Sequence, residues 1–271
     1  GEGGPPLPRS PGVPRGGTPR LSKPGAAGVL PFHPPHEPFF AEEGLGSTRF
    51  FLDFWAATRE TEPQRPVVLA TADHDYTRLR SGSRTPEQLG AALTFLFTWG
   101  SVPCLYYGDE IGMRYLPGMP DVEGAVCHPA YNRAGCRTPM QWDDGPNAGF
   151  STADPERLYL PIDPDPARPT VSAQDGDPGS TLALVRELIR LRRETPVLQG
   201  RAATTVLHES YPLAYRRGET HLVVVNPRGT SASLSVPGLT DAAVVWGRGV
   251  HVRGDRLEVD AFGHAVLELG S

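Results

Sequence analysis

The chain has 271 residues, which is enough for one large domain or two smaller ones. Its formal net charge of −5 and its isoelectric point near 5.9 argue against a nucleic-acid-binding surface. No apolar run approaches the roughly 20 residues that a membrane span needs, so neither nucleic acid nor a membrane is an expected partner.

The cysteine content indicates a reducing environment. Cys104, Cys127 and Cys136 leave at least one thiol unpaired, which favours a cytoplasmic location over a disulfide framework. Cys127, His128 and Cys136 do not match the spacing of a zinc site, and no fourth ligand is evident. We therefore expect no metal site and no cofactor.

The composition changes near residue 39. Residues 1–38 contain eleven Pro and eight Gly, a composition that cannot bury a core, so we expect this segment to be disordered or irregular. Beyond it, Phe51, Phe54 and Trp55 recur at helical spacing. They predict an amphipathic helix over residues 47–59, with Ser47 as its N-cap.

The apolar run over residues 67–70 leads directly into three ionisable side chains, Asp73, His74 and Asp75. The run is too short for a buried helix, so it predicts a buried parallel strand. Polar residues at the carboxyl end of such a strand occupy the position where α/β folds place their chemistry. The structural alternative is that Asp75 or Thr77 only caps a following helix.

A second helix and strand repeat this pattern. Residues 85–99 predict a helix, with Thr85 as N-cap and Gln88 as its capping-box partner. Residues 102–107 predict a second buried strand, which two further carboxylates follow. Alternation of helices and strands predicts a parallel sheet with right-handed crossovers.

Residues 113–178 form an excursion that is too long for an ordinary connection. Because aromatic and charged residues occur throughout it, we predict an ordered active-site loop. Apolar residues then recur at helical intervals over residues 180–194, which predicts an amphipathic helix that Pro196 ends.

From residue 201 onward the apolar residues alternate with a period of two. Six short runs separated by turn residues predict an antiparallel β-sandwich over residues 201–271. The runs cover residues 205–208, 213–216, 221–226, 232–236, 243–246 and 264–269.

Four motifs follow one another in the second part of the chain. They are Ala-Asp-His-Asp with Arg78 (72–78), Gly-Ser-Val-Pro-Cys-Leu-Tyr-Tyr-Gly-Asp-Glu-Ile-Gly-Met (100–113), a segment containing Arg-Thr-Pro-Met-Gln-Trp and Asn-Ala-Gly-Phe (132–150), and Leu-Pro-Ile-Asp followed by Leu-Ile-Arg-Leu-Arg-Arg (160–193). With them, residues 39–271 resemble the carboxyl-terminal part of the α-amylase superfamily, glycoside hydrolase family 13. The third motif is similar to a segment of α-glucosidase-type members.

The resemblance implies an α/β fold. Residues 39–200 would hold strands seven and eight, the last part of a (β/α)8 TIM barrel, and residues 201–271 the all-β antiparallel sandwich called domain C. The implied chemistry is retaining hydrolysis or transfer at an α-glucosidic bond, with an α-glucoside or maltooligosaccharide as substrate. One carboxylate attacks the anomeric carbon, a second protonates the leaving oxygen, and a third stabilises the oxocarbenium-like transition state.

The resemblance also assigns roles to three residues. Asp75 is the third, catalytic carboxylate, and His74 hydrogen-bonds the hydroxyls of the bound sugar. Arg137 closes the pocket around the non-reducing glucose and pairs with an upstream aspartate. The alternative for Arg137 is a solvated loop arginine.

Other charged residues near the predicted site are expected to have supporting roles, and one of them departs from the family pattern. Arg78 is expected to pair with an acidic neighbour and hold the loop, and Asp109 and Glu110 are expected to be structural. Asp73 stands where the family usually has Asn. The added charge is expected to raise the pKa of one neighbouring carboxylate or to alter the hydrogen bonding of His74.

A second departure concerns the rest of the barrel. The family's nucleophile and acid/base segments lie on strands four and five, and the sequence contains no match to strands one to six. We expect the barrel portion to be unstable by itself, because its edges and apolar faces lack cover. We also expect the 271-residue chain alone to be inactive.

Within the leading interpretation, an exo-α-glucosidase and a trehalose-forming isomerase share the same loop motif. A second interpretation is a non-catalytic, amylase-like binding protein. A third is an inactive truncated product, which the composition of residues 1–38 favours.

Overall fold

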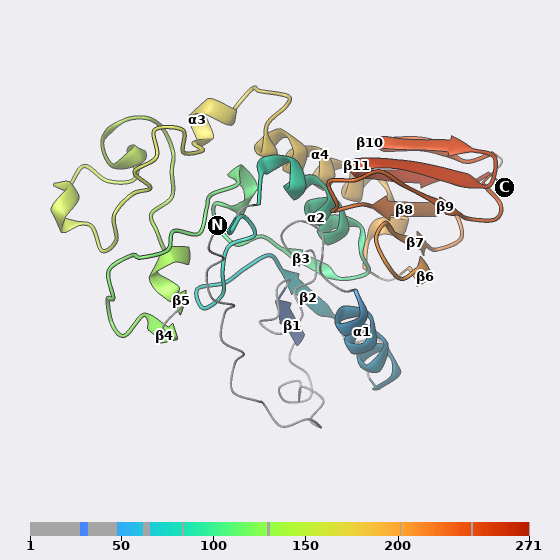
Figure 1. Cartoon of the computed structure of the whole chain (residues 1–271), viewed down its shortest axis with the longest axis horizontal. Coiled ribbons are helices and arrows are strands. Elements are labelled where there is room, and N and C mark those ends of the chain that lie inside the picture. The colour runs from blue at the N-terminus through green and yellow to red at the C-terminus, as the bar shows by residue number, and fades with distance from the viewer. Residues whose placement is uncertain are drawn as a thin grey trace, which may run out of the picture.

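The computed structural model describes residues 28–31, 48–61, 66–82, 84–128, 131–200, 202–239 and 241–270. Three parts lie side by side in these residues: a long excursion, a small parallel sheet with its helices, and an antiparallel sheet at the C-terminal end (Figure 1). The expected N-cap Ser47 lies outside the described residues.

The small sheet has the strand order β1–β2–β3, and both pairs are parallel. Its strands are β1 (Gly28–Pro31), β2 (Val67–Ala70) and β3 (Val102–Cys104). The predicted strand at residues 67–70 and its parallel pairing are therefore confirmed. β3 is shorter than the predicted 102–107, and the prediction that it is buried is wrong, because Val102 is 47% exposed and Cys104 is also exposed.

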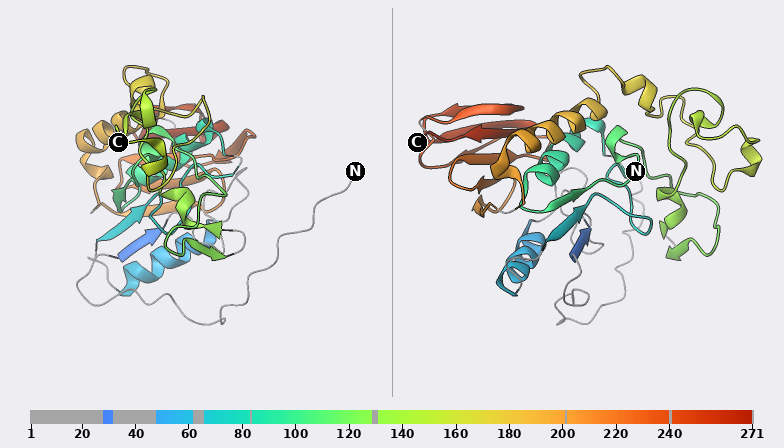
Figure 2. Two further views of the ribbon diagram at one scale, coloured as in Figure 1. Left: turned by 90° about the vertical axis from the view of Figure 1, so that its left-hand side faces the viewer. Right: turned by 180° about the vertical axis from the view of Figure 1, so that it is seen from behind.

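The strand β1 corrects one expectation. It lies within residues 1–38, which we expected to be irregular throughout, but residues 28–31 pair in register with the whole of β2. The short apolar sequence Gly-Val-Leu-Pro forms this strand, and it was not predicted because the surrounding residues are rich in Pro and Gly. The remaining residues of that segment lie outside the described part of the chain. Helix α1 (Arg49–Thr61) lies beside β1 and β2 (Figure 2).

Helix α2 (Pro86–Thr98) lies at the centre of the molecule, and every residue from Leu89 to Thr98 is buried. The backbone N–H of Thr85 donates to Gln88 Oε1 at 2.7 Å, which confirms the predicted N-terminus. Helix α4 (Thr181–Glu194) is also confirmed, and the Ser180 hydroxyl accepts a hydrogen bond from the Ala183 N–H at 3.1 Å.

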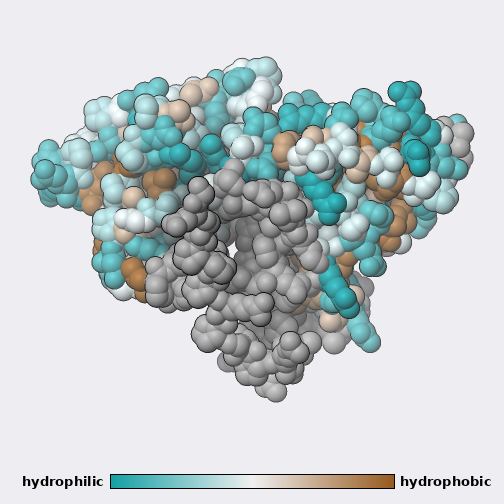
Figure 3. All heavy atoms as spheres, in the orientation of Figure 1, coloured by the Kyte–Doolittle hydropathy of each residue, from teal (hydrophilic) through white to brown (hydrophobic). Residues whose placement is uncertain are grey.

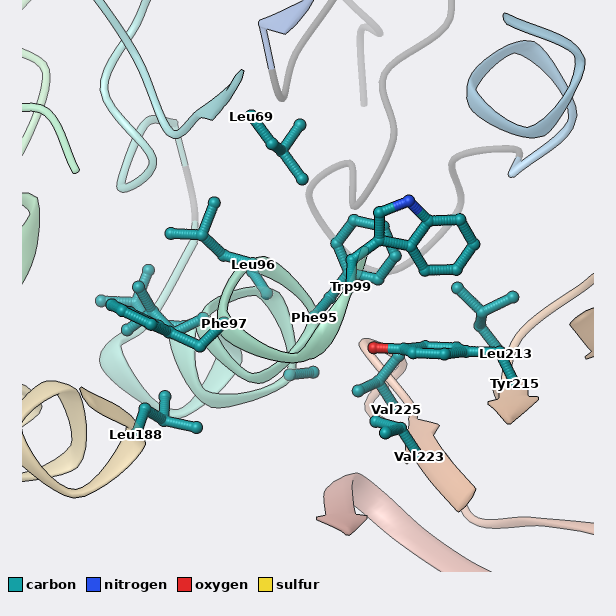
Figure 4. Packing of buried hydrophobic residues seen from close by; sticks show 14 of the residues in the cluster. Leu69, Phe95, Leu96, Phe97, Trp99, Leu188, Leu213, Tyr215, Val223 and Val225 are labelled. Atoms are coloured by element: carbon teal, nitrogen blue, oxygen red, sulfur yellow. The ribbon is translucent and has the colours of Figure 1, made fainter. Parts of the chain in front are cut away.

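One hydrophobic core joins the parallel sheet to the C-terminal sheet. Figure 4 shows side chains of α2 between Leu69 of β2, Leu188 of α4 and Tyr215 of the C-terminal sheet. The Trp99 and Tyr215 ring centroids lie 4.8 Å apart at 71°, an edge-to-face arrangement. The Tyr215 hydroxyl also lies 2.6 Å from Thr98 Oγ1. The boundary near residue 200 therefore separates types of secondary structure that share a core.

The C-terminal sheet is antiparallel, with the strand order β10–β11–β8–β7–β6 and with β9 paired to β11. Its strands are β6 (Thr204–His208), β7 (Leu213–Arg217), β8 (His221–Val225), β9 (Ala232–Ser235), β10 (Ala243–Arg253) and β11 (Arg256–Glu268). Alternate residues face two cores: Val223 and Val225 pack towards α2, whereas Leu222 and Val224 pack into a second cluster with Leu257. The predicted runs are confirmed as strands, and they form one continuous hydrogen-bonded sheet.

The excursion contains short elements connected by turns. They are η2 (Asp109–Ile111), β4 (Val126–His128), β5 (Tyr131–Asn132), η3 (Arg133–Cys136), η4 (Pro146–Gly149), η5 (Pro155–Arg157) and α3 (Val171–Gln174); η6 (Pro196–Leu198) follows α4. Figure 3 shows hydrophobic side chains exposed over the excursion, at the left, and over the C-terminal sheet, at the right. None of the helices in the described residues is long and apolar enough to cross a membrane.

Candidate active site

Asp73 shapes the turn that follows β2. Its Oδ1 accepts hydrogen bonds from the backbone N–H groups of Asp75, at 2.7 Å, and Tyr76, at 3.0 Å. This is the local pattern by which an aspartate stabilises a turn. The carboxylate of Asp73 therefore orders the backbone of Asp75, the residue expected to carry chemistry.

Asp75 is held by two arginines from the excursion. Its Oδ1 accepts from Arg133 Nη1 at 3.0 Å and from Arg137 Nη2 at 3.2 Å, while its backbone carbonyl accepts from the Tyr131 hydroxyl at 3.0 Å. His74 Nε2 lies 3.4 Å from Asp75 Oδ2. The carboxylate is 44% exposed, so it remains open to a ligand.

These contacts keep the Asp75 carboxylate ionised. The hydrogen bond from Arg133 is the main cause that holds the pKa of Asp75 below its usual value; burial opposes it, and the charges of His74, Arg133 and Arg137 reinforce it. The pKa of Asp75 is thus lowered rather than raised, and Asp73 is not among the groups that shift it, so the expected upward effect is not seen at this carboxyl.

Arg137 connects both residues at the end of β2. Its Nε donates to the His74 carbonyl at 2.8 Å and its Nη2 donates to Asp75 Oδ1. One guanidinium therefore bonds both the backbone of His74 and the carboxylate of Asp75. Only 20% of its side chain is exposed, which excludes the alternative of a freely solvated arginine. The aspartate that pairs with Arg137 in the described structure is Asp75. The three predicted site residues thus lie together.

Arg133 is a site residue that the sequence interpretation missed. It approaches Asp75 across 58 positions of sequence, and its Nη2 also donates to the Gly124 carbonyl at 3.0 Å. The available signal was its spacing of four residues before Arg137 in the same motif.

The excursion is folded so that both arginines reach Asp75. Asn132 starts η3 by accepting the Ala134 N–H at 2.8 Å, and its Nδ2 donates to the Met119 carbonyl at 2.5 Å. The Tyr115 and Tyr131 rings stack with centroids 5.7 Å apart. A Cβ at Gly135 would overlap the Leu116 carbonyl oxygen and the Tyr115 ring, so this close approach requires glycine.

Supporting residues lie beneath the site. Arg78 is buried and pairs with Asp109, as expected, and its guanidinium lies over the Tyr107 ring at 4.6 Å. Asp109 is 1% exposed, which agrees with a structural role. Buried Cys136 donates its thiol hydrogen to the Arg133 carbonyl at 2.9 Å, and burial raises the pKa of this thiol. Among the described residues, no group of three or more His, Cys, Asp or Glu side chains is placed to hold a metal ion.

Comparison with known proteins decides the family. Residues 51–200, more than half of the chain, match the alpha-amylase family, described as "Alpha amylase, catalytic domain". The chain belongs to the α-amylase family. The resemblance carried by the four motifs is therefore confirmed.

Relatives of this α-amylase-family chain include a salivary alpha-glucosidase of Aedes aegypti, 34% identical over 62% of this chain and 29% of the relative. The trehalose synthase/amylase TreS of Mycobacterium tuberculosis is 39% identical over 44% of this chain and 18% of the relative. The trehalose synthase of Thermus thermophilus is 35% identical over 59% of this chain and 16% of the relative. The chain thus spans less than a third of the length of these relatives.

Solved structures of the same family share the fold. An isomaltulose synthase from Erwinia rhapontici NX5 superposes with a TM-score of 0.69 at 23% identity, over 83% of this chain and 47% of that one. A mutant of the trehalulose synthase MutB in complex with Tris gives 0.68 at 25% identity, over 82% and 46%. These α-amylase-family structures support a catalytic-domain portion followed by a sheet of antiparallel strands. The numbering of β2 and β3 as barrel strands seven and eight stays a prediction.

Proposed function

We propose that this chain forms part of the active site of a retaining glycosidase or glucosyl transferase that acts on α-glucosidic bonds. The observation that carries the proposal is the Asp75 carboxylate, which lies just beyond the end of a parallel strand and is kept ionised by Arg133 and Arg137. A fixed, ionised and accessible carboxylate stabilises positive charge that develops on a sugar ring.

Asp75 would act as the stabilising carboxylate rather than as nucleophile or acid. In a retaining mechanism the nucleophile and the acid/base are two further carboxylates about 5–5.5 Å apart. In the described residues the side chains within hydrogen-bond reach of Asp75 are arginines, with His74 slightly farther away. The nucleophile and the acid/base would come from other strands of an α-amylase-type barrel.

His74 and Arg137 would hold the non-reducing glucose of the substrate, which is the glycosyl unit and not the leaving group. The His74 side chain is 69% exposed beside Asp75, so its ring is free to hydrogen-bond a sugar hydroxyl. Arg137 has a fixed position because it bonds the His74 carbonyl and Asp75 together. Arg137 would close the pocket at the non-reducing glucose. Arg133 would position Asp75 by its hydrogen bond to the Asp75 carboxylate.

The test uses the chain completed with the upstream barrel strands of an α-amylase-family relative. Asp75→Asn keeps the shape of the side chain but removes the charge, so kcat should fall on the order of a hundredfold or more while KM changes little. Asp241→Asn, an exposed position in the C-terminal part, serves as the matched control and should be neutral. A nearly silent Asp75→Asn would show that Asp75 is not the stabilising carboxylate, whereas a completed chain that binds maltose without turnover would favour a non-catalytic binding protein.

The products formed from maltose distinguish the two reactions within this class. The relatives include proteins named alpha-glucosidase and proteins named trehalose synthase, so both reactions are candidates. Free glucose as the main product would identify a hydrolase. Accumulation of trehalose would identify a glucosyl isomerase, in which the bound glucosyl unit is transferred before water enters.

A further inference from the structure

A second pocket lies where the helices of the barrel portion meet the C-terminal sheet. Its volume is about 390 Å³, and it shares no lining residue with the candidate active site. The first turns of α2 and α4 form one side, and neighbouring positions of β10 and β11 form the other. Figure 1 shows α2, α4, β10 and β11 adjacent to one another in this part of the molecule.

His264 supplies a buried polar group to this pocket. The residue is only 2% exposed, yet it is one of the lining residues. Its Nδ1 lies 2.9 Å from the Phe262 carbonyl, which fixes the hydrogen on Nδ1 and leaves Nε2 as an acceptor. No hydrogen bond joins Nε2 to any residue that the structure describes. Burial lowers the pKa of His264 to about 4, so the ring is uncharged near neutral pH.

Trp246 gives the pocket an aromatic surface. Its ring centroid lies 5.8 Å from that of His264, with the planes inclined by 39°. The indole is partly exposed and lines the pocket from β10. An aromatic face next to a few fixed polar groups suits a ligand that is apolar on one face and hydroxylated at its rim.

The charges around the pocket are of both signs. Glu87 of α2 and Glu187 of α4 lie on one side and Arg248 of β10 on the other. A side-chain hydrogen bond to Thr85 is the main cause that lowers the pKa of Glu87, and the Arg248 charge adds to this shift. Opposed charges disfavour a strongly anionic or cationic ligand. The two glutamates offer hydrogen-bond acceptors, and Arg248 offers a donor, to a neutral polyhydroxylated ligand.

We propose that this pocket binds one or two sugar units of a neutral glucoside, as a second carbohydrate site between the barrel portion and the C-terminal sheet. A pyranose ring stacks on Trp246, and one hydroxyl donates to His264 Nε2. The carboxylates of Glu87 and Glu187 accept from other hydroxyls. The choice of a glucoside as ligand rests on the proposed function, whereas the site itself rests on the pocket.

The test titrates maltotriose into the full 271-residue chain and follows binding by saturation-transfer NMR and calorimetry. Trp246→Ala should weaken binding at least tenfold, because it removes the stacking surface. Glu187→Gln, an exposed change on α4 that should not affect folding, should weaken binding severalfold. Glu194→Gln, equally exposed at the end of the same helix, is the matched control and should leave binding unchanged.

Arg137→Ala separates this site from the candidate active site. Binding that persists in Arg137→Ala and is lost in Trp246→Ala supports the second site, whatever kinetic assays of the completed enzyme show. Two results would overturn it: no binding of maltotriose by the wild-type chain, or binding that Arg137→Ala abolishes while Trp246→Ala and Glu187→Gln leave it intact.

Discussion

Arg78 and Asp109 form a fully buried ion pair whose nearest atoms, Nη1 and Oδ1, are 3.8 Å apart. The other carboxylate oxygen of Asp109 accepts a hydrogen bond from Thr71 Oγ1 at 2.5 Å, and Thr71 is the first residue after β2. The Arg78 guanidinium donates to the Tyr107 carbonyl beyond β3. The pair thereby ties the ends of two neighbouring strands beneath Asp75.

The buried carboxyl of Asp109 should make stability depend on pH. Burial raises its pKa to about 6 from 3.8, although Arg78 and Thr71 oppose the shift. Between these values the native state binds a proton that the unfolded state has released, so the free energy of unfolding falls as the pH rises from about 4 to about 6. Relative to Asp109→Asn, the wild type should lose on the order of 2–3 kcal/mol over this range.

Urea unfolding of both proteins at several pH values from 4 to 7 measures this difference. Asp109→Asn also leaves Arg78 without its partner, but that cost is the same at every pH because arginine does not titrate there. A difference between the two proteins that stays constant with pH would show that the Asp109 pKa is not raised.

Arg133 and Arg137 share one oxygen of Asp75, but their replacement should have different effects in the completed enzyme. Arg133→Ala removes the main cause of the lowered Asp75 pKa, so the acid limb of the kcat profile should move to higher pH.

Arg137→Ala should instead weaken binding of short substrates and let longer chains extend past the pocket. Kinetics with maltose and with longer maltooligosaccharides would compare them. Unchanged substrate-length preference in Arg137→Ala would rule out its proposed role.

The 271-residue chain by itself should not hydrolyse maltose or a nitrophenyl α-glucoside. One carboxylate cannot act as stabiliser, nucleophile and acid in the same reaction, and Asp75 is held by two arginines. Release of glucose or nitrophenol is measured against a buffer control. Turnover clearly above that control would mean that Asp75 has been assigned the wrong role.

Gly90→Ala should destabilise the protein, although alanine is the better helix former. In most helices this change gains about 0.5–1 kcal/mol. Here the new Cβ would overlap His264 Cε1 and lie 3.1 Å from each ring nitrogen, and His264 is too buried to move freely. Overpacking of this kind costs about 1–3 kcal/mol, so the clash should outweigh the helical gain.

Thermal or urea unfolding would measure the sign of this effect. Gly200→Ala provides the control, because its Cβ would meet no atom within 4 Å and its φ is not positive. If Gly90→Ala were as stable as wild type, the contact between α2 and β11 would be looser than described here.

Local signals predicted much of the fold. The strand β2 was predicted with its observed bounds, because a four-residue apolar run ends abruptly in charged residues. The starts of α2 and α4 followed from capping residues whose hydrogen bonds are present. β1 was missed because its pairing partner, rather than its own composition, makes it a strand.

The candidate site was predicted only as far as its motifs reached. Asp75, His74 and Arg137 lie together because each belongs to a recognisable segment. The contact of Arg133 with Asp75 depends on how the excursion folds back across 58 residues, and the only local signal for it was the position of Arg133 four residues before Arg137. The packing of Tyr215 on Trp99 was hidden for the same reason, since it joins parts of the chain more than a hundred residues apart.

The last strand, β11, pairs with β8, β9 and β10. On the ribosome these three strands emerge before their common partner, and β8 can form only its pairing with β7. Their unpaired edges stay available to other chains until about residue 268 has left the exit tunnel. The C-terminal sheet is therefore completed only when β11 has emerged, and loss of the whole of β11 would leave β9 and β10 without a strand partner and β8 with β7 alone.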